Sequence, residues 1–467
     1  MSSDAARVVV IGGGLAGMSA AAALTAAGCD VTLVEKRPSL GGRAGSHPDA
    51  AAGGPIDTGQ HVLMPCCTNL LDFLRRIGAE RHLRFYREIP FLSPQGAVTR
   101  LRASLLPAPL HFLPSFLALP FLDLGDKAAI ARALAAVCRQ YRRRTLPPLP
   151  FGDWLRSQRQ TRRAAEYFWR PIVASALNEQ IERAATVYAA KFFVEAFLAN
   201  SRAWWLGVPT VPLSSLYDKD NKRRIAREIL LRTEVRQLRL RDGRVAEAEA
   251  AGGRVLAAGT FVLALPWHAA GALLPDHAAS LAGLERAQDL EPSPITGIHL
   301  WYDRPVTDYD FAVLPGRSVH WFFDKTRTSG PKSSPDCYLQ LVASASRSWS
   351  RLGRKEILEI ALRELGAALP ESARAKLVRA RVLRAPAATF SPNATCDALR
   401  PPPATAVANL FLAGDWIRTG WPATMESAVR GGYLAAEAVT AAHGRAQRFL
   451  VPDLPPSGLM RSRDMRP

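Results

Sequence analysis

Cysteine is scarce and scattered in this chain of 467 residues. The six cysteines form no Cys-x-x-Cys pair, and no group of His and Cys has the spacing of a zinc site. Cys66 and Cys67 are adjacent, so they cannot easily bridge each other. We therefore expect reduced thiols, no metal site and a cytoplasmic protein.

We also expect no cleavable leader. Residues 1–7 run directly into an apolar stretch at 8–11, which leaves no room for the apolar core of a signal peptide. One stretch without charge, 103–122, has the length of a membrane span but is broken by prolines at 107, 109, 114 and 120. Because proline removes backbone hydrogen bonds, we do not expect a transmembrane helix there.

The segment 103–122 leaves three interpretations open. It can line a buried lipid cavity, lie in the membrane interface as a monotopic anchor, or be an ordinary core segment. Arginines flank it closely at 100, 102, 132, 139 and 142–144. An apolar wedge with a cationic rim suits an anionic lipid surface, so we expect peripheral attachment to the inner face of the cytoplasmic membrane.

Acidic residues are outnumbered, 41 against 60 lysines and arginines, which gives a net charge of +19. Such a charge favours an anionic partner, either nucleic acid or an anionic membrane. The chain has no zinc finger, recognition-helix motif or RNP-like motif. Its basic residues are mostly arginine, with only nine lysines, as in proteins from GC-rich genomes. We therefore expect no nucleic-acid binding.

A dinucleotide-binding motif stands at the start of the chain. An apolar strand at 8–11 runs into Gly12-x-Gly14-x-x-Gly17, followed by a helix rich in small residues. The glycines permit a tight turn, close approach of the backbone to a pyrophosphate, and helix–strand packing. A second strand ends in Glu35, 18 residues after Gly17, where a carboxylate can bind an adenosine ribose.

Further motifs resemble those of the flavin amine oxidase and carotenoid desaturase superfamily. They are Gly42-Arg43, the Asp57-x-Gly59 motif with Gln60 and His61, and a strand ending in Gly414-Asp415 before a helix near Thr424. The resemblance implies noncovalent FAD, with that helix directed at the flavin. The residues assigned to FAD are Gly12, Gly14, Leu15, Ala16, Gly17, Glu35, Lys36, Gly42, Arg43, Gly59, Gln60, His61, Val235, Gly414, Asp415, Ala423, Thr424, Met425 and Ser427.

Narrower strings resemble the hydroxysqualene dehydroxylases, the squalene-associated FAD-dependent proteins of bacterial hopanoid pathways. These strings are Gly59-Gln60-His61-Val62-Leu63-Met64 with 66–71, the proline-broken segment 106–110, and 419–428. The family implies that hydroxysqualene and reduced FAD give squalene, water and oxidised FAD. It also implies a polyprenyl lipid substrate and squalene-synthase-like pathway partners.

The proton donor for the leaving hydroxyl is open between three residues. His61 is preferred because a histidine can hold a proton near neutral pH. Asp57 lies in the same motif, and Glu426 begins the closing helix. Each also has a structural interpretation: His61 can hold backbone, Asp57 can cap a turn, and Glu426 can serve the helix terminus.

The fold class expected is α/β, a Rossmann-like FAD domain with an interleaved substrate domain and an apolar helical cap. The FAD domain comprises 1–85, 210–267 and 400–445, the cap 86–209, the substrate sheet 268–399, and a tail 446–467. We also expect one strand over 227–238, a hairpin over 239–259 and a strand over 261–267.

Three alternatives remain. A phytoene-type desaturase would use the same fold with hydride moving toward the flavin. An amine oxidase usually places a lysine near the flavin, and the sequence places none of its nine lysines there. A third possibility is a membrane-bound protein that carries flavin without turnover and serves as a scaffold.

Overall fold

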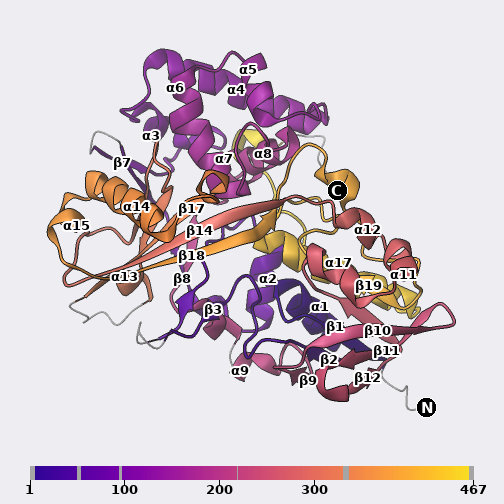
Figure 1. The fold of residues 1–467 in the computed structure, drawn as a ribbon. Helices are drawn as coiled ribbons and strands as arrows, with labels where there is room; N and C mark the ends of the chain where they lie inside the picture. Colours follow the sequence, from indigo (N-terminus) through magenta and orange to yellow (C-terminus); the bar gives the residue numbers. More distant parts are fainter. Residues whose placement is uncertain (1–5, 50–53, 94–96, 218, 330–335, 462–467) are drawn as a thin grey trace.

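The chain begins in the middle of a parallel sheet of five strands (Figure 1). The computed structural model describes residues 6–49, 54–93, 97–217, 219–329 and 336–461. The strands of this sheet, in spatial order, are β19 (Leu410–Leu412), β13 (Thr260–Leu263), β1 (Arg7–Ile11), β2 (Asp30–Val34) and β9 (Glu228–Leu230). All neighbouring pairs are parallel. β1 and β13 are almost wholly apolar because helices and loops cover both faces.

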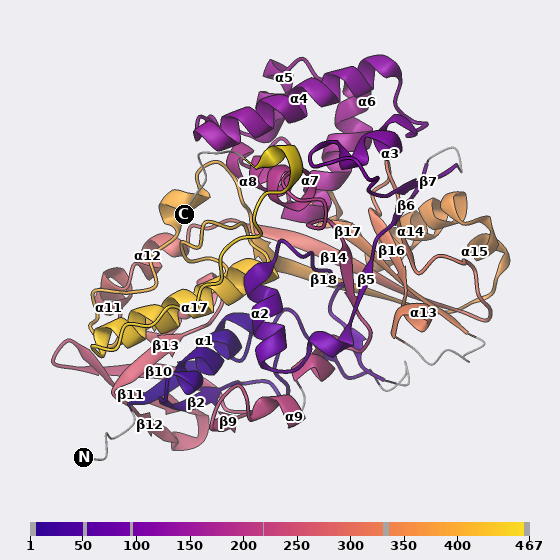
Figure 2. The ribbon, with the colours of Figure 1, turned by 180° about the vertical axis from the view of Figure 1, so that it is seen from behind.

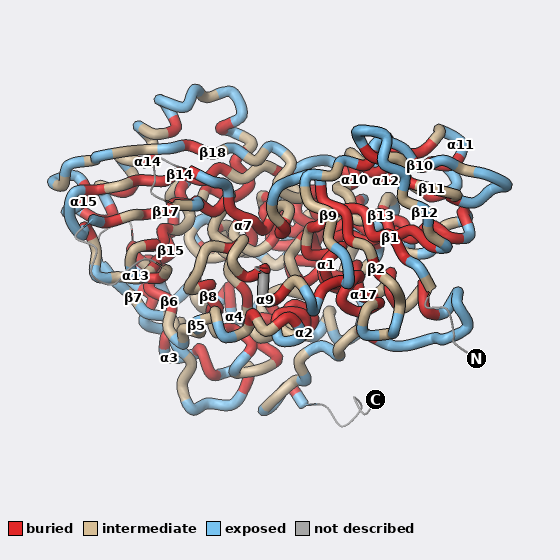
Figure 3. Tube along the Cα trace, turned by 90° about the horizontal axis from the view of Figure 1, so that it is seen from below, coloured by how far each residue is buried: buried red, intermediate tan, exposed pale blue. Residues whose placement is uncertain are grey.

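Two helices from opposite ends of the chain lie together on this sheet. α1 (Leu15–Ala26) follows the glycine turn, and α17 (Met425–Ala442) packs against it. Their small residues permit close contact: a Cβ on Gly432 of α17 would lie 2.3 Å from the carbonyl oxygen of Ala16 of α1. Figure 2 shows α17, α1 and α2 side by side, and Figure 3 shows the buried trace concentrated along β1, β13 and α1. The glycine turn before α1 and the loop before α17 therefore meet at one edge of the sheet.

An antiparallel sheet of seven strands forms the second layer. Its strands, in spatial order, are β18 (Leu377–Phe390), β14 (Pro292–Tyr302), β17 (Cys337–Ser344), β16 (Trp321–Asp324), β15 (Phe311–Val313), β6 (Ile89–Leu92) and β7 (Val98–Leu101). The single parallel contact is that of β15 with β6. β6 and β7 lie in the range 86–209 that the sequence assigns to the cap, but they pair with each other at the edge of this sheet.

Helices between Leu110 and Leu198 cover the upper side of the molecule in Figure 1. They are η3 (Leu110–Phe112), α3 (Leu113–Leu117), α4 (Leu124–Arg143), α5 (Phe151–Ser157), α6 (Arg162–Ala164), η4 (Ala165–Trp169), α7 (Arg170–Leu177), α8 (Thr186–Phe192) and η5 (Phe193–Leu198). α4 begins with a capping box of Asp123 and Asp126. Phe151 stacks on Trp154 and meets Trp169 edge to face, so aromatic rings fill the core of the cap.

Most of the remaining elements are short, and α14 (Arg354–Ala368) is the longest of them. They are β3 (Ser46–His47), β4 (Ile56–Asp57), α2 (Thr68–Arg76), η2 (Glu80–His82), β5 (Leu83–Tyr86), β8 (Leu206–Pro209), η6 (Leu213–Tyr217), α9 (Lys219–Lys222), β10 (Val235–Arg241), β11 (Arg244–Ala250), η7 (Ala251–Gly253), β12 (Val255–Ala257), α10 (Trp267–Ala270), η8 (Gly271–Leu273), α11 (Asp276–Leu281), α12 (Leu284–Ala287), α13 (Lys325–Ser329), η9 (Arg347–Trp349), α14 (Arg354–Ala368), α15 (Pro370–Arg374), α16 (Cys396–Leu399) and η10 (Gly458–Met460).

The mixed α/β class is confirmed, but one predicted strand is wrong. The range 227–238 is split between β9, in the parallel sheet, and β10, in a separate sheet with β11 and β12. Arg232 lies between them with a φ of 54°, so the chain turns there and cannot continue as one strand. The strand predicted at 261–267 ends at Leu263, and α10 begins directly after Pro266.

The apolar segment 103–122 folds as turns, η3 and α3. Within the described ranges, no helix combines the length and the apolar composition that crossing a bilayer requires. All six cysteines are free thiols. The predicted tail, 446–467, is described as far as Arg461, and its last six residues lie outside the described part of the chain.

Candidate functional site

A cavity of about 1760 Å³ extends from the carboxyl edge of the parallel sheet into the helical cap. At one end its walls are the glycine turn, Glu35 and the loop before α17. At the other end they are aromatic and aliphatic side chains of the cap, with β15 and β16 between. Small-molecule sites usually measure about 300–1,000 Å³. The space is therefore large enough for two ligands, one at each end.

The glycine turn shapes the polar end of this cavity. Gly12 has a φ of 112°, and a Cβ there would lie 2.4 Å from the carbonyl oxygen of Ala264. Gly14 differs, because a Cβ there would meet no atom within 4 Å and would project into open space. Gly14 also caps α1, whose first N–H groups have no partner within the helix. This cradle fits a pyrophosphate.

Glu35 closes the cradle on the side of β2. Its Oε2 accepts a hydrogen bond from the Gly13 N–H (2.7 Å), and its Oε1 accepts one from the Arg37 N–H (2.8 Å). The carboxylate is thereby held in one orientation. Each oxygen keeps a further lone pair for a ribose hydroxyl. Val235, at the start of β10, lies in the same part of the wall.

Arg43 joins the two ends of the chain at the cavity. Its Nη2 lies 2.5 Å from Asp415 Oδ1, and its Nη1 donates to the carbonyl of Ala388 (3.0 Å). The turn before it bonds directly to the glycine turn, since the Gly41 N–H donates to the carbonyl of Gly13 (2.9 Å). Gly42, Arg43, Gly414 and Asp415 thus form one continuous part of the wall.

The N-terminus of α17 faces the same space. Thr424 caps the helix, with its Oγ1 accepting from the Ser427 N–H (3.1 Å). Ala423, Thr424 and Met425 line the cavity, whereas Ser427 lies behind them and donates to the carbonyl of Asp415 (3.0 Å). The positive end of the helix dipole therefore lies where negative charge on a bound group would be stabilised.

His61 lies in the wall between the two ends of the cavity. Its Nδ1 lies 2.9 Å from the carbonyl oxygen of Gly59, which assigns the ring proton to Nδ1. Burial is the main cause that lowers the pKa of His61 below its ordinary value; the hydrogen bond to Gly59 and the charge of Asp57 oppose this effect, and the charges of Arg43 and Lys325 add to it. The imidazole is therefore neutral at pH 7, and Nε2 is an acceptor.

Asp57 is buried in the structure beneath this wall. Its Oδ1 accepts from Ser46 Oγ (2.7 Å) and the Leu213 N–H (3.0 Å), and its Oδ2 pairs with Lys325 Nζ (3.1 Å). Lys325 Nζ also donates to Gln60 Oε1 (3.0 Å). Lys325 thus orients the Gln60 amide in the cavity wall, although the sequence places no lysine near this site.

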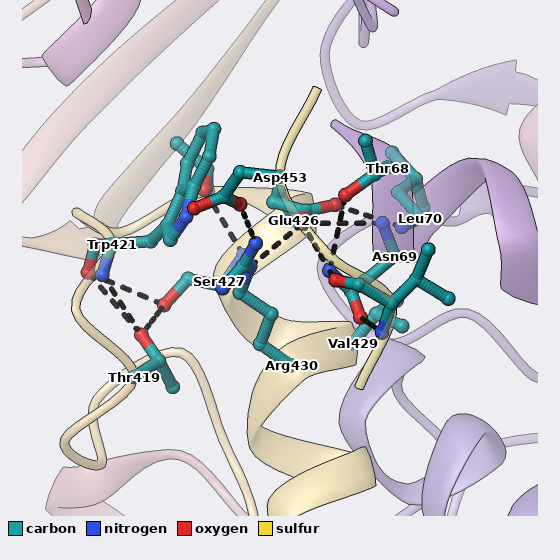
Figure 4. Close-up of polar contacts among 12 residues, drawn as sticks. Thr68, Asn69, Leu70, Thr419, Trp421, Glu426, Ser427, Val429, Arg430 and Asp453 are labelled. Atoms are coloured by element: carbon teal, nitrogen blue, oxygen red, sulfur yellow. Dashed lines mark hydrogen bonds and ion pairs between the residues drawn. The ribbon is translucent and has the colours of Figure 1, made fainter. Parts of the chain in front are cut away.

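Glu426 is fully buried at the first turn of α17 (Figure 4). Its Oε2 accepts from the Leu70 N–H (2.8 Å), and its Oε1 accepts from Asn69 Nδ2 (2.9 Å) and Arg430 Nε (2.8 Å). All of these partners are donors, so a proton on Glu426 would face no acceptor among them. Through these hydrogen bonds Glu426 connects α17 to the start of α2, which is a structural role.

The cap supplies an apolar end to the cavity. Its lining comes from α3, α4, η4, α7 and η5, and it includes Leu113, Phe116, Leu134, Phe168, Phe193 and Phe197. Phe168 stacks on Phe193 at 6.3 Å between ring centroids. Such a wall excludes water and binds hydrocarbon by burial of apolar surface.

The predicted FAD residues gather around one space. Of those that the structure describes, Gly17 and Ser427 lie behind the wall, as does the catalytic candidate Asp57, while the other assigned residues line it. The individual roles stay predictions. The sequence reasoning missed Lys191, Lys325 and Arg400. Arg400 Nη2 donates to the carbonyl of Asp415 (3.0 Å) and holds the Gly-Asp loop, and only its position in a proline-rich run near that loop could have indicated it.

Comparisons with known proteins agree with this geometry. The sequence model of the family described as flavin containing amine oxidoreductase matches residues 15–440. The chain is 26% identical over 466 residues to a 15-cis-phytoene desaturase of Synechococcus elongatus, covering 95% of this chain and 97% of the relative. It is 27% identical over 480 residues to a zeta-carotene desaturase of Solanum lycopersicum, covering 92% and 80%.

Solved structures show the same fold. A cyclohexylamine oxidase from Brevibacterium oxydans aligns with a TM-score of 0.68 at 19% identity, over 94% of this chain and all of that one. At this identity the likeness concerns the fold alone. It agrees with the arrangement of a parallel nucleotide-binding sheet, a second sheet and a cap.

Proposed function

The chain belongs to the flavin containing amine oxidoreductase family, and on this premise we propose that it catalyses the reductive dehydroxylation of hydroxysqualene to squalene. FAD is its cofactor, and the chain is an FAD-dependent oxidoreductase. The observation that carries the proposal is one continuous cavity, whose polar end fits a dinucleotide and whose apolar end fits a long isoprenoid chain.

The chain's own residues would hold FAD along the polar end. The glycine turn and α1 would bind the pyrophosphate, Glu35 the ribose, and Val235 the adenine side, as in the Rossmann arrangement. Asp415, fixed by Arg43 and Arg400, would bind the ribityl region. Reduced FAD, when bound, supplies a hydride.

The apolar end suits the proposed reaction. The hydroxyl of hydroxysqualene is allylic, so its protonation and loss as water leave a delocalised cation. That cation survives longer where water is kept away, and the aromatic and aliphatic lining of this end disfavours water. The strings at 59–64 and 419–428 support this reaction through their resemblance to hydroxysqualene dehydroxylases.

A phytoene-type desaturation is the second candidate. The neutral imidazole of His61 favours it, because a buried Nε2 acceptor suits removal of a proton better than its donation. The curated relatives named desaturases support it as well. In this reaction the hydride moves from the hydrocarbon to the oxidised cofactor.

We also propose that the protein docks on an anionic membrane through the segment 103–122. Leu105 is fully exposed, and Leu117 and Leu124 are 51% and 79% exposed. Leu110 and Leu113 are both exposed and part of the cavity lining, so the cavity opens on this face. α4 carries exposed arginines at 139, 142 and 143, which also line the cavity. These charges complement anionic lipid. The opening of the cavity on this face would let an insoluble substrate enter directly from the membrane.

Anaerobic single turnover tests the reaction. The flavin of the purified protein is reduced without oxygen and mixed with hydroxysqualene, while flavin absorbance and product mass are followed. We expect reoxidation of the flavin with one squalene formed per flavin. Geraniol, a short allylic alcohol, is the control, and we expect little reaction because it cannot fill the apolar end.

The reverse experiment, which starts from oxidised enzyme and a hydrocarbon, distinguishes the dehydroxylase from the desaturase. Oxidised enzyme is mixed anaerobically with squalene or phytoene. Bleaching of the flavin by a hydrocarbon, with no response of reduced enzyme to hydroxysqualene, would replace the dehydroxylase by the desaturase.

A further inference from the structure

A charged side chain interrupts the apolar end of the cavity. Lys191, on α8, lies in the cavity wall among phenylalanines of α8 and η5, and its side chain is 14% exposed. Its Nζ lies 2.8 Å from Glu195 Oε1 and 4.7 Å from the centroid of the Trp421 ring. Burying an ammonium group beside hydrocarbon is unfavourable. A site for a pure hydrocarbon would gain nothing from this charge.

Trp421, in the loop before α17 (Figure 4), presents its ring to the ammonium of Lys191. The backbone N–H of Trp421 donates to Thr419 Oγ1 (3.2 Å), and the Trp421 carbonyl oxygen lies 3.4 Å from Ser427 Oγ. Trp421 lies three residues before Thr424, which is at most about 10 Å of extended chain. The ammonium of Lys191 is therefore near the end of α17 that faces the polar part of the cavity.

A second cation, Arg430, also lies beside Trp421, but acidic side chains already bind it. Arg430 Cζ lies 5.2 Å from the Trp421 ring centroid, but its guanidinium is held by Glu426 and Asp453. Lys191 has an acceptor in Glu195 and the face of the Trp421 ring. An ammonium has three N–H groups, so with these contacts, drawn from the described residues, one remains for a ligand.

The carboxylate of Glu195 is held in place beside Lys191 by two donors. Its Oε1 accepts from both Lys191 Nζ and Tyr141 Oη. Burial raises the pKa of Tyr141, and the charge of Glu195 adds to the effect, so the phenol remains a donor. Tyr141 thus orients the carboxylate, and the carboxylate orients the ammonium.

Resting on the proposed function, we infer that Lys191 is the proton donor to the departing hydroxyl of the substrate. One Nζ–H bond breaks and one O–H bond forms. The C–O bond breaks with its electron pair going to oxygen, which leaves as water. The resulting allylic cation accepts the hydride that reduced FAD supplies, and the neutral Lys191 amine recovers a proton from solvent.

The surroundings of Lys191 suit this step better than those of the three residues predicted from sequence. His61 is neutral, Asp57 is buried behind the wall, and Glu426 is surrounded by donors. Proton transfer also removes the positive charge of Lys191 as the cation forms.

The test compares Lys191→Met with Lys191→Arg in the FAD-loaded protein. Lys355→Met, an exposed position on α14, is the matched control. General-acid catalysis contributes about 10²–10⁴-fold. We therefore expect Lys191→Met to slow single-turnover formation of squalene at least about 100-fold, with Lys355→Met unchanged. Arginine keeps the charge but does not release a proton, so Lys191→Arg should stay slow.

Two further readouts separate proton donation from a structural role. The acetate ester of the alcohol leaves as a carboxylate without protonation, so the two variants should lose little rate with it. Binding to the oxidised protein, followed by tryptophan fluorescence, should show that Lys191→Met weakens binding of the alcohol several-fold and that of squalene hardly at all.

The outcomes are distinct. Unchanged rates in Lys191→Met, or full activity in Lys191→Arg, would overturn the inference while leaving the dehydroxylase intact. Wild-type protein that forms no squalene would overturn the proposed function itself. If Lys191→Met loses FAD, the test uses the ratio of the ester rate to the alcohol rate in Lys191→Arg. A ratio well above that of wild type supports proton donation by Lys191, and an unchanged ratio overturns it.

Discussion

Arg43 Nη2 lies 2.5 Å from Asp415 Oδ1, although 372 residues separate the two in sequence. The pair joins the Gly-Gly-Arg turn near the start of the chain to the Gly-Asp loop near its end. Asp415 is almost completely buried, and Arg43 is partly exposed to the cavity. The two ends of the chain must therefore meet before the polar end of the cavity is complete.

Asp415→Asn is expected to weaken FAD binding. Asparagine keeps the shape but removes the charge that holds Arg43, and hydrogen bonds to charged groups contribute about 1.5–3 kcal/mol. We expect FAD affinity to fall by about 10- to 100-fold, measured by flavin release on dilution. Asp276→Asn, on α11 away from the cavity, is the control. Unchanged affinity in Asp415→Asn would remove this residue from the cofactor site.

Alanine at Gly12 and at Gly14 should act differently. A Cβ at Gly12 would clash with the Ala264 carbonyl and strain a left-handed backbone, so Gly12→Ala should lower the melting temperature of the apoprotein. A Cβ at Gly14 meets no protein atom but enters the space for the pyrophosphate. Gly14→Ala should keep the apoprotein stable and lose FAD affinity, as seen by comparing thermal melts with and without FAD.

Glu426→Gln tests the structural assignment of this carboxylate. Removing one partner of a buried ion pair lowers the free energy of unfolding by about 3–5 kcal/mol. We expect a loss of this order in urea denaturation, since Arg430 and the start of α2 lose their charged partner. Glu356→Gln, at the exposed first turn of α14, should change stability by less than about 1 kcal/mol. A stable Glu426→Gln protein that had lost only turnover would return Glu426 to the proton-donor candidates.

Acid should destabilise the fold through His299. Burial is the main cause that lowers the pKa of His299 from 6.5 to about 4, with Lys325 and Arg381 lowering it further and Asp57 opposing them. The unfolded chain therefore binds more protons than the folded one between these values. The contribution of His299 is complete above pH 6.5 and is lost as the pH falls to about 4.

At 1.36 kcal/mol per unit, this contribution is about 3 kcal/mol. His299→Gln should reduce the difference in unfolding free energy between pH 7 and pH 4 by this amount. Chemical denaturation of both proteins at the two pH values measures it. The same pH dependence in variant and wild type would show that His299 is not responsible.

The exposed leucines should govern membrane binding. Each leucine transferred from water to lipid contributes about 1.5–3 kcal/mol. Replacing Leu105, Leu113 and Leu117 together by serine should weaken binding to phosphatidylglycerol vesicles by about 100-fold or more in flotation. Leu281→Ser, an exposed leucine on α11, should bind as wild type does. Equal flotation of the triple variant would show that this face does not meet the membrane.

Much of the polar end could be predicted from sequence. The strand, glycine turn and helix of 7–26 are local structures, and the acid directly after β2 occurs at a characteristic distance from the turn. The range 227–238 could not be predicted, because its two halves join different sheets after a turn at Arg232. Apolar alternation alone does not say which sheet a strand enters.

The sequence by itself determined the α/β class, the glycine turn, Glu35 and the Gly414-Asp415 loop. These depend on backbone preferences and on spacings of a few residues. Only the tertiary structure decided that Lys325 holds Asp57 and Gln60, that Glu426 caps α2, and that Lys191 lies against Trp421. Each of these contacts joins segments that are far apart in the chain. No local pattern encodes them, because they exist only once the cap, the two sheets and α17 have packed around one cavity.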